Sequence, residues 1–400
     1  DGQSVWLSVF SHCIKILGGK RMKIIVYAIC KNESGFVDRW MDSMQEADRV
    51  IVLDTGSTDD TVQKLRSRGA RVYEEQFSPW RFDTARNRSL ELVDDDADLC
   101  VCTDLDEYFL PGWRAELERV WSPGVTQVRY PYVWSFRADG SDGVTFWYEK
   151  IHARHGYKWT HPVHEVLSWI GEGTPGKTVD APGMRLEHHP DPAKSRGQYL
   201  PLLELSVRED PDDDRNTHYL GREYFYYRRW DDCIRTLKKH LAMPNALWAD
   251  ERAASMRYIA SSYSHKGQPD EAVRWYLRAA AEAPHLREPL TDLALELYYQ
   301  KDWHGVLFAA GRALRITKRP RTYICEADAW GSLPWDLMAV AYYNIGRNTL
   351  ALEYALQALE LDPGNERLQN NVRLLRELED AAALPPVFRD SNQLPGENAE

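Results

Sequence analysis

Two aspartates that stand two residues apart are the side chains best suited to chemistry in this sequence. Asp104 and Asp106 directly follow residues 98–103 (DLCVCT), which have the apolar pattern of a buried strand. In open α/β sheets, ligands bind beyond the carboxyl ends of the strands. Two carboxylates at such an end can bind one hard divalent cation, and that cation can also bind a diphosphate. Alternatively, both aspartates are ordinary turn and helix-capping residues.

Two further polar segments also follow predicted strands. Asp54 ends an apolar segment and is followed by residues 56–59 (GSTD). The glycine permits a tight turn, and the serine, threonine or aspartate after it can cap the next helix. The Asp54 carboxylate can also accept hydrogen bonds from a base or a ribose. Asn32 and Glu33 follow the first strand in the same way, with a plain polar loop as the alternative.

The elements that must position these side chains alternate between strands and helices. Strands are predicted at 23–30, 49–53, 71–74 and 98–103, and helices at 36–47, 59–68 and 82–92. This alternation predicts an α/β fold of βαβ units with a parallel sheet and right-handed crossovers. Beyond residue 120 the sequence is rich in aromatic and β-forming residues, and strands are expected at 127–136, 144–154, 161–169 and 184–189.

From residue 215 the pattern indicates helices only. Four segments align on one template, at 229–234, 268–273, 302–307 and 347–352, with spacings of 39, 34 and 45 residues. The tetratricopeptide period is about 34 residues, so one interval fits and two contain insertions. Such helix pairs bury their apolar faces by stacking on their neighbours. The second half is therefore predicted to be an all-α, tetratricopeptide-like solenoid.

These changes in pattern divide the chain into four predicted parts. We expect an N-terminal extension over 1–21, a nucleotide-binding α/β domain over 22–212, a repeat domain over 213–384 and a disordered tail over 385–400. The boundary between the two domains is placed at the polar segment 210–214, which is rich in aspartate.

Composition excludes several classes of protein. Hydrophobic residues make up 43% and charged residues 28% of the 400 residues, which is unlike collagen, a disulfide scaffold or a largely disordered chain. The net charge of −11 disfavours nucleic acid as a partner without excluding it, because Arg228, Arg229, Lys238 and Lys239 form a local basic cluster.

The six cysteines include no CxxC pair, which favours a reduced, cytoplasmic protein. No apolar segment approaches the ~18 residues that span a bilayer.

Taken together and in this order, the polar segments resemble the family 2 glycosyltransferases, which have a Rossmann-like GT-A nucleotide-sugar domain. The resemblance covers about residues 22–190 and rests on 28–33 (AICKNE), 54–59 (DTGSTD), 80–87 (WRFDTARN), 104–107 (DLDE) and 163–165 (VHE). More closely, the chain resembles the subgroup that fuses this domain to tetratricopeptide repeats, which includes the sublancin S-glycosyltransferase. Leu105 is a departure, because the family more often has a small residue there.

The resemblance implies roles for individual residues. Donor-binding roles are implied for Asn32, Glu33, Asp54, Arg86 and Asp104. Asp54 would bind the base and Arg86 the diphosphate, although Arg86 can also be an ordinary helix-surface residue. Asp104 and Asp106 would bind Mg²⁺ or Mn²⁺, and either His188 or His189 would complete the metal site.

An inverting transferase also needs a base on the acceptor side, opposite the departing diphosphate. Glu165 and His164 match the acceptor-side segment of the family and are the candidate catalytic residues. Desolvation can bring the pKa of a glutamate close to neutral, as a general base requires. The alternative is that Glu165 forms an ion pair with an arginine.

The sequence therefore predicts a metal-dependent, inverting glycosyltransferase that moves a hexose from a nucleoside diphosphate sugar, with UDP-glucose as the default donor. The extended face of a repeat domain favours a protein or peptide acceptor, ahead of a glycan, a lipid-linked sugar or a modified DNA base. A homodimer through the repeats stays open. The rival interpretations are a repeat scaffold with an inactive transferase domain and a metal-dependent phosphohydrolase, for which no further Asp/His set is present.

Overall fold

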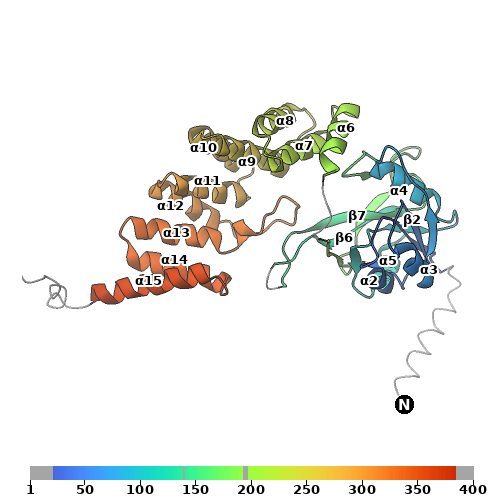
Figure 1. The fold of residues 1–400 in the computed structure, drawn as a ribbon, viewed down its shortest axis with the longest axis horizontal. Helices are drawn as coiled ribbons and strands as arrows, with labels where there is room; N and C mark the ends of the chain where they lie inside the picture. Colours follow the sequence, from blue (N-terminus) through green and yellow to red (C-terminus); the bar gives the residue numbers. More distant parts are fainter. Residues whose placement is uncertain (1–20, 138–139, 192–196, 384–400) are drawn as a thin grey trace, which may run out of the picture. The chain divides into compact units, whose positions relative to one another are not determined.

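The computed structural model describes residues 21–137, 140–191 and 197–383, and these residues form two compact units (Figure 1). Of the described residues, the α/β unit contains 21–135 and 147–191. The helical unit contains the described residues 136–137, 140–146 and 197–383. The helical unit therefore includes a short segment that leaves the sheet between two of its strands.

The predicted ends of the chain are only partly described. The tail over 385–400 lies outside the described residues, and so does all but the last residue of the extension over 1–21. Helix α6 (Tyr199–Glu209) clusters with the helical unit, which begins at residue 195. The expected boundary after residue 212, which concerns separable domains, stays a prediction.

The α/β unit is built on a nine-stranded sheet in the order β3-β2-β1-β4-β7-β6-β11-β5, with β10 paired to β6. The first four strands are parallel to one another, which confirms the predicted βαβ arrangement. The strands of this sheet are β1 Ile24–Cys30, β2 Arg49–Asp54, β3 Arg71–Glu74, β4 Leu99–Cys102, β5 Glu107–Phe109, β6 Val125–Val133, β7 Thr145–Ala153, β10 Lys177–Asp180 and β11 Leu186–His188.

One expected strand is wrong in its extent. The segment 161–169 is not continuous, because His161 and His164 have positive φ angles of 75° and 50° and form a turn. The turn joins β8 (Tyr157–Thr160) to β9 (Val166–Trp169), and the two strands pair with each other antiparallel. The turn also contains Glu165, so the predicted catalytic segment is a loop between two short strands.

Helices cover both faces of the sheet, and this explains why β1 is apolar throughout. Adjacent strand residues point to opposite faces, and all seven residues of β1 are buried. Ile25 and Tyr27 pack with Leu90 of α4 (Phe82–Glu91) on one face. In Figure 1, α4 lies on the opposite side of the sheet from the remaining helices, which are α2 (Val37–Ser43), α3 (Thr61–Ser67) and α5 (Trp113–Val120).

The helical unit continues from α6 as consecutive helix pairs. Its helices are α7 Asp214–Tyr226, α8 Trp230–Ala242, α9 Ala249–His265, α10 Pro269–Glu282, α11 Glu288–Tyr299, α12 Trp303–Leu314, α13 Leu333–Asn344, α14 Asn348–Leu361 and α15 Glu366–Ala383. The four template segments fall at the starts of α8, α10, α12 and α14, the second helix of each pair, as the repeat pattern predicts. Within the described part of the chain, no helix is both long and apolar enough to cross a membrane.

Each of these four pairs makes the same turn. The residue two positions before the second helix has a positive φ angle, and these residues are Arg228, Gly267, Lys301 and Gly346. The next residue donates its N–H to the carbonyl five positions earlier, as from Gln268 to Tyr263 at 2.9 Å. This is the Schellman motif, which ends a helix by satisfying carbonyls that have no further partner along it.

Candidate functional site

The polar segments that follow β1, β2 and β4 lie at one edge of the sheet. Cys30 at the end of β1 pairs with Asp54 at the end of β2, and Tyr27 pairs with Cys102 at the end of β4. The carboxyl ends of these parallel strands therefore carry Asn32, Asp54 and Asp104 to neighbouring positions, as the sequence predicts.

The loop after β1 is bound to the loop after β2. The Asn32 N–H donates to Ser57 Oγ at 2.8 Å, and Asn32 Oδ1 accepts from the Thr58 N–H at 2.7 Å. The Glu33 N–H donates to Thr61 Oγ1 at 2.8 Å. Asn32 has a φ angle of 55°, which asparagine tolerates better than most residues. The two predicted nucleotide-binding loops thus form one connected surface.

Asp54 organises its own turn. Its Oδ1 accepts hydrogen bonds from the N–H groups of Gly56 at 3.0 Å and Ser57 at 2.9 Å. The Ser57 hydroxyl donates to Asp54 Oδ2. Gly56 has a φ angle of 109°, which side chains rarely permit. These contacts hold the turn after β2 and do not cap α3, whose N-cap residue Asp60 makes no side-chain capping hydrogen bond. A contact between Asp54 and a base stays a prediction.

A buried arginine, itself a predicted site residue, joins two others. Arg86 on α4 is only 3% exposed, so the alternative of a helix-surface arginine is wrong. Its Nη2 donates to Asp104 at 2.8 and 3.2 Å, and its Nε donates to Glu165 Oε1. The ion pair between Glu165 and an arginine, which was the alternative for this glutamate, is therefore formed.

Lys150 and Glu107 extend this cluster and were missed in the sequence. Lys150 on β7 donates to Asp104 Oδ2 at 3.1 Å and lies 3.4 Å from both oxygens of Glu107. Glu107 Oε1 also accepts from the Tyr132 hydroxyl at 2.7 Å, and Glu107 Oε2 accepts from the Asp104 N–H at 3.0 Å. Glu107 could have been identified from the sequence, because it directly follows Asp106. Lys150 has no such signal, because only strand pairing brings β7 beside β4.

The cluster shifts the pKa values of its carboxyl groups in opposite directions. Burial alone would raise the pKa of Asp104, but Arg86 and Lys150 outweigh burial and hold that pKa well below its usual range. Burial raises the pKa of Glu107, and Lys150 offsets only part of that effect. Asp104 is thus kept as an anion between two cations.

Of the two candidate metal-binding histidines, His188 is the one that lies beside Asp106. Its Nε2 is 3.5 Å from Asp106 Oδ2, and its Nδ1 donates to the carbonyl of Trp134 at 3.1 Å. His189 instead lies 3.2 Å from Glu187 and stacks on Tyr108. A carboxylate oxygen and an imidazole nitrogen suit a divalent cation such as Mn²⁺, so these side chains fit the predicted metal. The metal-binding role of Asp104, Asp106, His188 and His189 stays a prediction.

The catalytic role of the turn between β8 and β9 also stays a prediction. Glu165 follows His164, whose backbone is in the left-handed region, and the side chain of Glu165 is about one tenth exposed. The turn is anchored to α4 because the Phe82 N–H donates to the carbonyl of Pro162 at 3.0 Å. Asn87 and Trp159 strengthen the connection through two hydrogen bonds of 2.8 Å. Glu165 is therefore held by rigid neighbours at the edge that carries Asp104.

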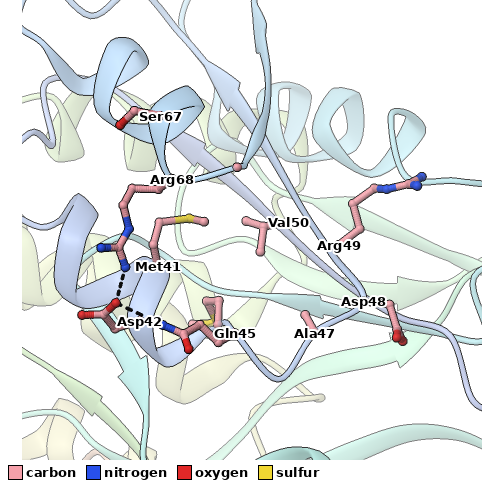
Figure 2. A pocket seen from close by; sticks show the side chains of 11 residues that line it. Met41, Asp42, Gln45, Ala47, Asp48, Arg49, Val50, Ser67 and Arg68 are labelled. Atoms are coloured by element: carbon pink, nitrogen blue, oxygen red, sulfur yellow. Dashed lines mark hydrogen bonds and ion pairs between the residues drawn. The ribbon is translucent and has the colours of Figure 1, made fainter.

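A pocket of about 590 Å³ lies elsewhere in the α/β unit (Figure 2). It is lined by residues that include Met41 and Asp42 of α2, Arg49 and Val50 at the start of β2, and Arg68 after α3. The Arg68–Asp42 ion pair visible in Figure 2 crosses one side of it. Because β2 begins there and ends at Asp54, this pocket is at the opposite end of the strand from the charged cluster. None of the predicted site residues lines it, and we do not assign the chemistry to it.

Comparison with known proteins separates the chain into the same two parts. Residues 25–162 match the model of the family described as Glycosyl transferase family 2. Residues 259–290 and 334–365 each match a tetratricopeptide repeat model. The first match includes Asn32, Asp54, Arg86, Asp104 and Asp106, and it ends before His164.

Similar solved structures cover only part of the chain. "Crystal structure of MamA" is 17% identical, covers 41% of this chain and 86% of that chain, and has a TM-score of 0.34. "Functional Characterization of Pseudomonas Aeruginosa pilF" is 13% identical, covers 42% and 70%, and has a TM-score of 0.34. "Arabidopsis OM64 TPR domain" is 16% identical, covers 32% and 98%, and has a TM-score of 0.28. TM-scores this low carry no argument about function.

Proposed function

We propose a reaction for this chain on the premise that it is a nucleotide-sugar glycosyltransferase, with a glycosyl transferase family 2 domain followed by tetratricopeptide repeats. The reaction is the transfer of a hexose from a nucleoside diphosphate sugar, with UDP-glucose as the default donor, to a protein or peptide acceptor with inversion. The observation that supports it is the buried cluster in which Arg86 bridges Asp104 and Glu165 at the carboxyl ends of the parallel strands. This cluster brings the proposed donor side and acceptor side into direct contact.

The proposed roles follow from the chemistry of each group. Asp106 and His188 would hold a divalent cation, which when bound neutralises charge on the departing diphosphate. Arg86 holds Asp104 and Glu165 in fixed positions. Glu165 takes the proton of the acceptor nucleophile as it attacks the anomeric carbon, and His164 orients the acceptor or Glu165.

The acceptor is proposed from the second unit. Stacked repeats offer an extended concave surface that suits a protein or peptide. The likeness to the sublancin subgroup adds a thiol as a candidate nucleophile, and a thiol ionises near neutral pH with little help.

A chain that ends at residue 212 should still bind the donor but should lose a macromolecular acceptor. Full transfer by the shortened chain would remove the repeats from acceptor recognition.

The function is tested by incubating the full chain with a panel of nucleotide sugars, with and without Mn²⁺, while recording hydrolysis and melting temperature. We expect a UDP-sugar to raise the melting temperature and to be hydrolysed in a metal-dependent way. Asp106→Ala and His188→Ala should each lower that turnover more than the tenfold typical of changes around a metal ligand, and His189→Ala should not.

Asp42→Asn is a matched control for these variants, because Asp42 lies beside the pocket at the other end of the strands. It should behave like the unchanged chain. Binding of no nucleotide sugar would support the scaffold interpretation, and near-normal turnover in Asp106→Ala would contradict the metal site.

A further inference from the structure

Three helix ends in the helical unit bring together a second set of groups that can bind a metal ion. Asp214 is the first residue of α7, His240 lies in the last turn of α8, and Glu251 lies in the first turn of α9. One ligand atom from each residue lies within 4.8 Å of the others. The three helices are consecutive in the chain and neighbours in Figure 1. This cluster is separate from the residues proposed for the transfer reaction.

The histidine of the cluster is oriented by a buried neighbour. His240 Nδ1 lies 2.9 Å from Ser255 Oγ, and the same hydroxyl lies 2.7 Å from Nδ1 of His218. A hydroxyl can donate to one ring and accept from the other, so Ser255 fixes both rings. The other nitrogen of His240, Nε2, is directed at the carboxylates and lies 3.3 Å from Glu251 Oε1. Nε2 is buried and makes no hydrogen bond within the described part of the chain.

Each carboxylate is also held by a neighbour. The Tyr323 hydroxyl donates to Glu251 Oε2, and the Asn245 side chain donates to Asp214 Oδ1 at 3.2 Å. Metal-binding histidines and carboxylates are usually oriented in this way by hydrogen bonds to their remaining atoms. The arrangement is therefore more than a chance group of acidic residues, because all three potential ligands have an orienting partner.

The two carboxylates of the cluster differ in how well their charge is stabilised. Burial would raise the pKa of Glu251, but His240, His218 and Tyr323 outweigh burial and lower that pKa. Burial and the neighbouring Glu251 raise the pKa of Asp214, which reflects repulsion between two carboxylates near each other. Both Glu251 and His240 are almost completely buried. A divalent cation would offset this repulsion, whereas a proton can be shared by only two of the groups at a time.

We propose that Asp214, His240 and Glu251 bind a first-row divalent cation that joins the ends of α7, α8 and α9. One imidazole nitrogen and two carboxylate oxygens form a donor set that suits Zn²⁺, with a water molecule in the remaining position. The bound cation would stabilise the first repeats of the helical unit. The proposal does not depend on the transfer reaction.

Zn²⁺ is the probe that tests this site. Asp106→Ala is introduced into the full chain first, so that the metal site proposed for the transferase does not contribute. The metal-free protein is then titrated with Zn²⁺, and the zinc retained after gel filtration and the melting temperature are measured. We expect Asp214→Asn and His240→Gln each to retain one equivalent less than the parent chain and to lose most of the Zn²⁺-dependent rise in melting temperature.

His304→Gln is the matched control, because His304 is an exposed histidine on α12 of the same unit. It should retain zinc like the parent chain. His240 is fully buried, so its variant can lose stability for other reasons; Asp214 is partly exposed, and Asp214→Asn decides the matter if His240→Gln fails to fold. A parent chain that retains no zinc, or an Asp214→Asn chain that retains as much as His304→Gln, would overturn the proposal and leave the cluster a metal-free hydrogen-bond network.

Discussion

Arg86 is the residue that connects the parts of the proposed active site. It is a cation with almost no access to solvent, and it is satisfied by Asp104 and Glu165 on segments that are distant in the sequence. Breaking a buried ion pair by removing one partner typically costs 3–5 kcal/mol, because the other charge stays buried without compensation. Arg86 should therefore matter for stability as well as for activity.

We expect Arg86→Ala to lower the free energy of unfolding by about 3–5 kcal/mol and to abolish transfer. Arg88→Ala is the control on the same helix, because Arg88 forms exposed ion pairs with Glu75 and Glu91. Exposed pairs of this kind contribute about 0–1 kcal/mol. Urea denaturation of both variants gives the comparison. Equal effects of the two substitutions would show that the bridge adds nothing to stability.

Glu165→Gln tests whether Glu165 is the catalytic base. The amide keeps the shape of the side chain but cannot take a proton, and general-base catalysis is typically worth 10²–10⁴-fold. We expect the transfer rate to fall by about that factor, with donor affinity little changed, and the effect of His164→Ala should be milder. With a thiol acceptor the loss should be smaller. An active Glu165→Gln beside an inactive His164→Ala would make His164 the base.

At the scale of the elements, the four repeated turns of the helical unit allow the effect of backbone conformation on stability to be distinguished from the effect of side-chain packing. Two of its four left-handed positions hold glycine, and the other two hold Arg228 and Lys301. A side chain added at Gly346 would meet no atom within 4 Å. The difference between these positions is therefore one of backbone strain rather than of side-chain packing.

Lys301→Gly should increase the stability of the helical unit. A residue with a Cβ atom in the left-handed region is destabilised by about 1–2 kcal/mol, and glycine removes this strain but loses more conformational entropy on folding. We expect a net gain of about 0.5–1 kcal/mol in urea denaturation. Lys301→Ala, which removes the side chain but keeps the strain, should show no such gain. A gain of equal size from alanine would assign the effect to the lysine side chain instead.

At the scale of the whole molecule, the buried polar groups make the stability of the fold depend on pH. The α/β unit buries Arg86, Glu107 and Lys150 of the charged cluster, together with a histidine in the sheet. His152 on β7 is fully buried, and its Nε2 lies 2.8 Å from the Tyr27 hydroxyl. Burial lowers the pKa of His152 to about 4. A histidine in the unfolded chain has a pKa of about 6.5, so folding keeps His152 neutral where the unfolded chain would protonate it.

This difference should make folding sensitive to acid. Below about pH 6.5 His152 takes up a proton in the unfolded chain but stays neutral in the folded chain. Its contribution to the free energy of unfolding therefore falls as the pH drops from 6.5 toward 4, by at most about 1.4 kcal/mol per pH unit. Burial also lowers the pKa of His218, to about 3, so His218 adds to the slope of the whole chain. Urea denaturation at pH 7 and pH 5 measures the loss. His152→Gln should flatten the dependence, and the difference between the two chains isolates this histidine from other groups that titrate there. An unchanged slope in the variant would contradict the assignment.

Local patterns in the sequence are enough to predict the types of the elements and the positions of the polar strand ends. The apolar pattern of β1 and β2, the glycine after Asp54 and the repeated segments of the helical unit act over a few residues, so they can be recognised locally. The parallel order of the first four strands follows from the alternation of strands and helices. Errors arose where positive φ angles at His161 and His164 interrupted a β-like pattern.

Which of these polar residues meet depends on tertiary contacts between distant segments. Arg86 contacts a glutamate 79 positions away, and Lys150 contacts an aspartate 46 positions away, because distant strands and turns are packed together. Although the register of β11 with β5 sets His188 opposite Glu107 and the His189 N–H donates to the Asp106 carbonyl at 2.8 Å, it is the side chain of His188 that lies 3.5 Å from the Asp106 carboxylate. Such long-range pairing depends on the packing of the whole unit, which no local pattern in the chain encodes.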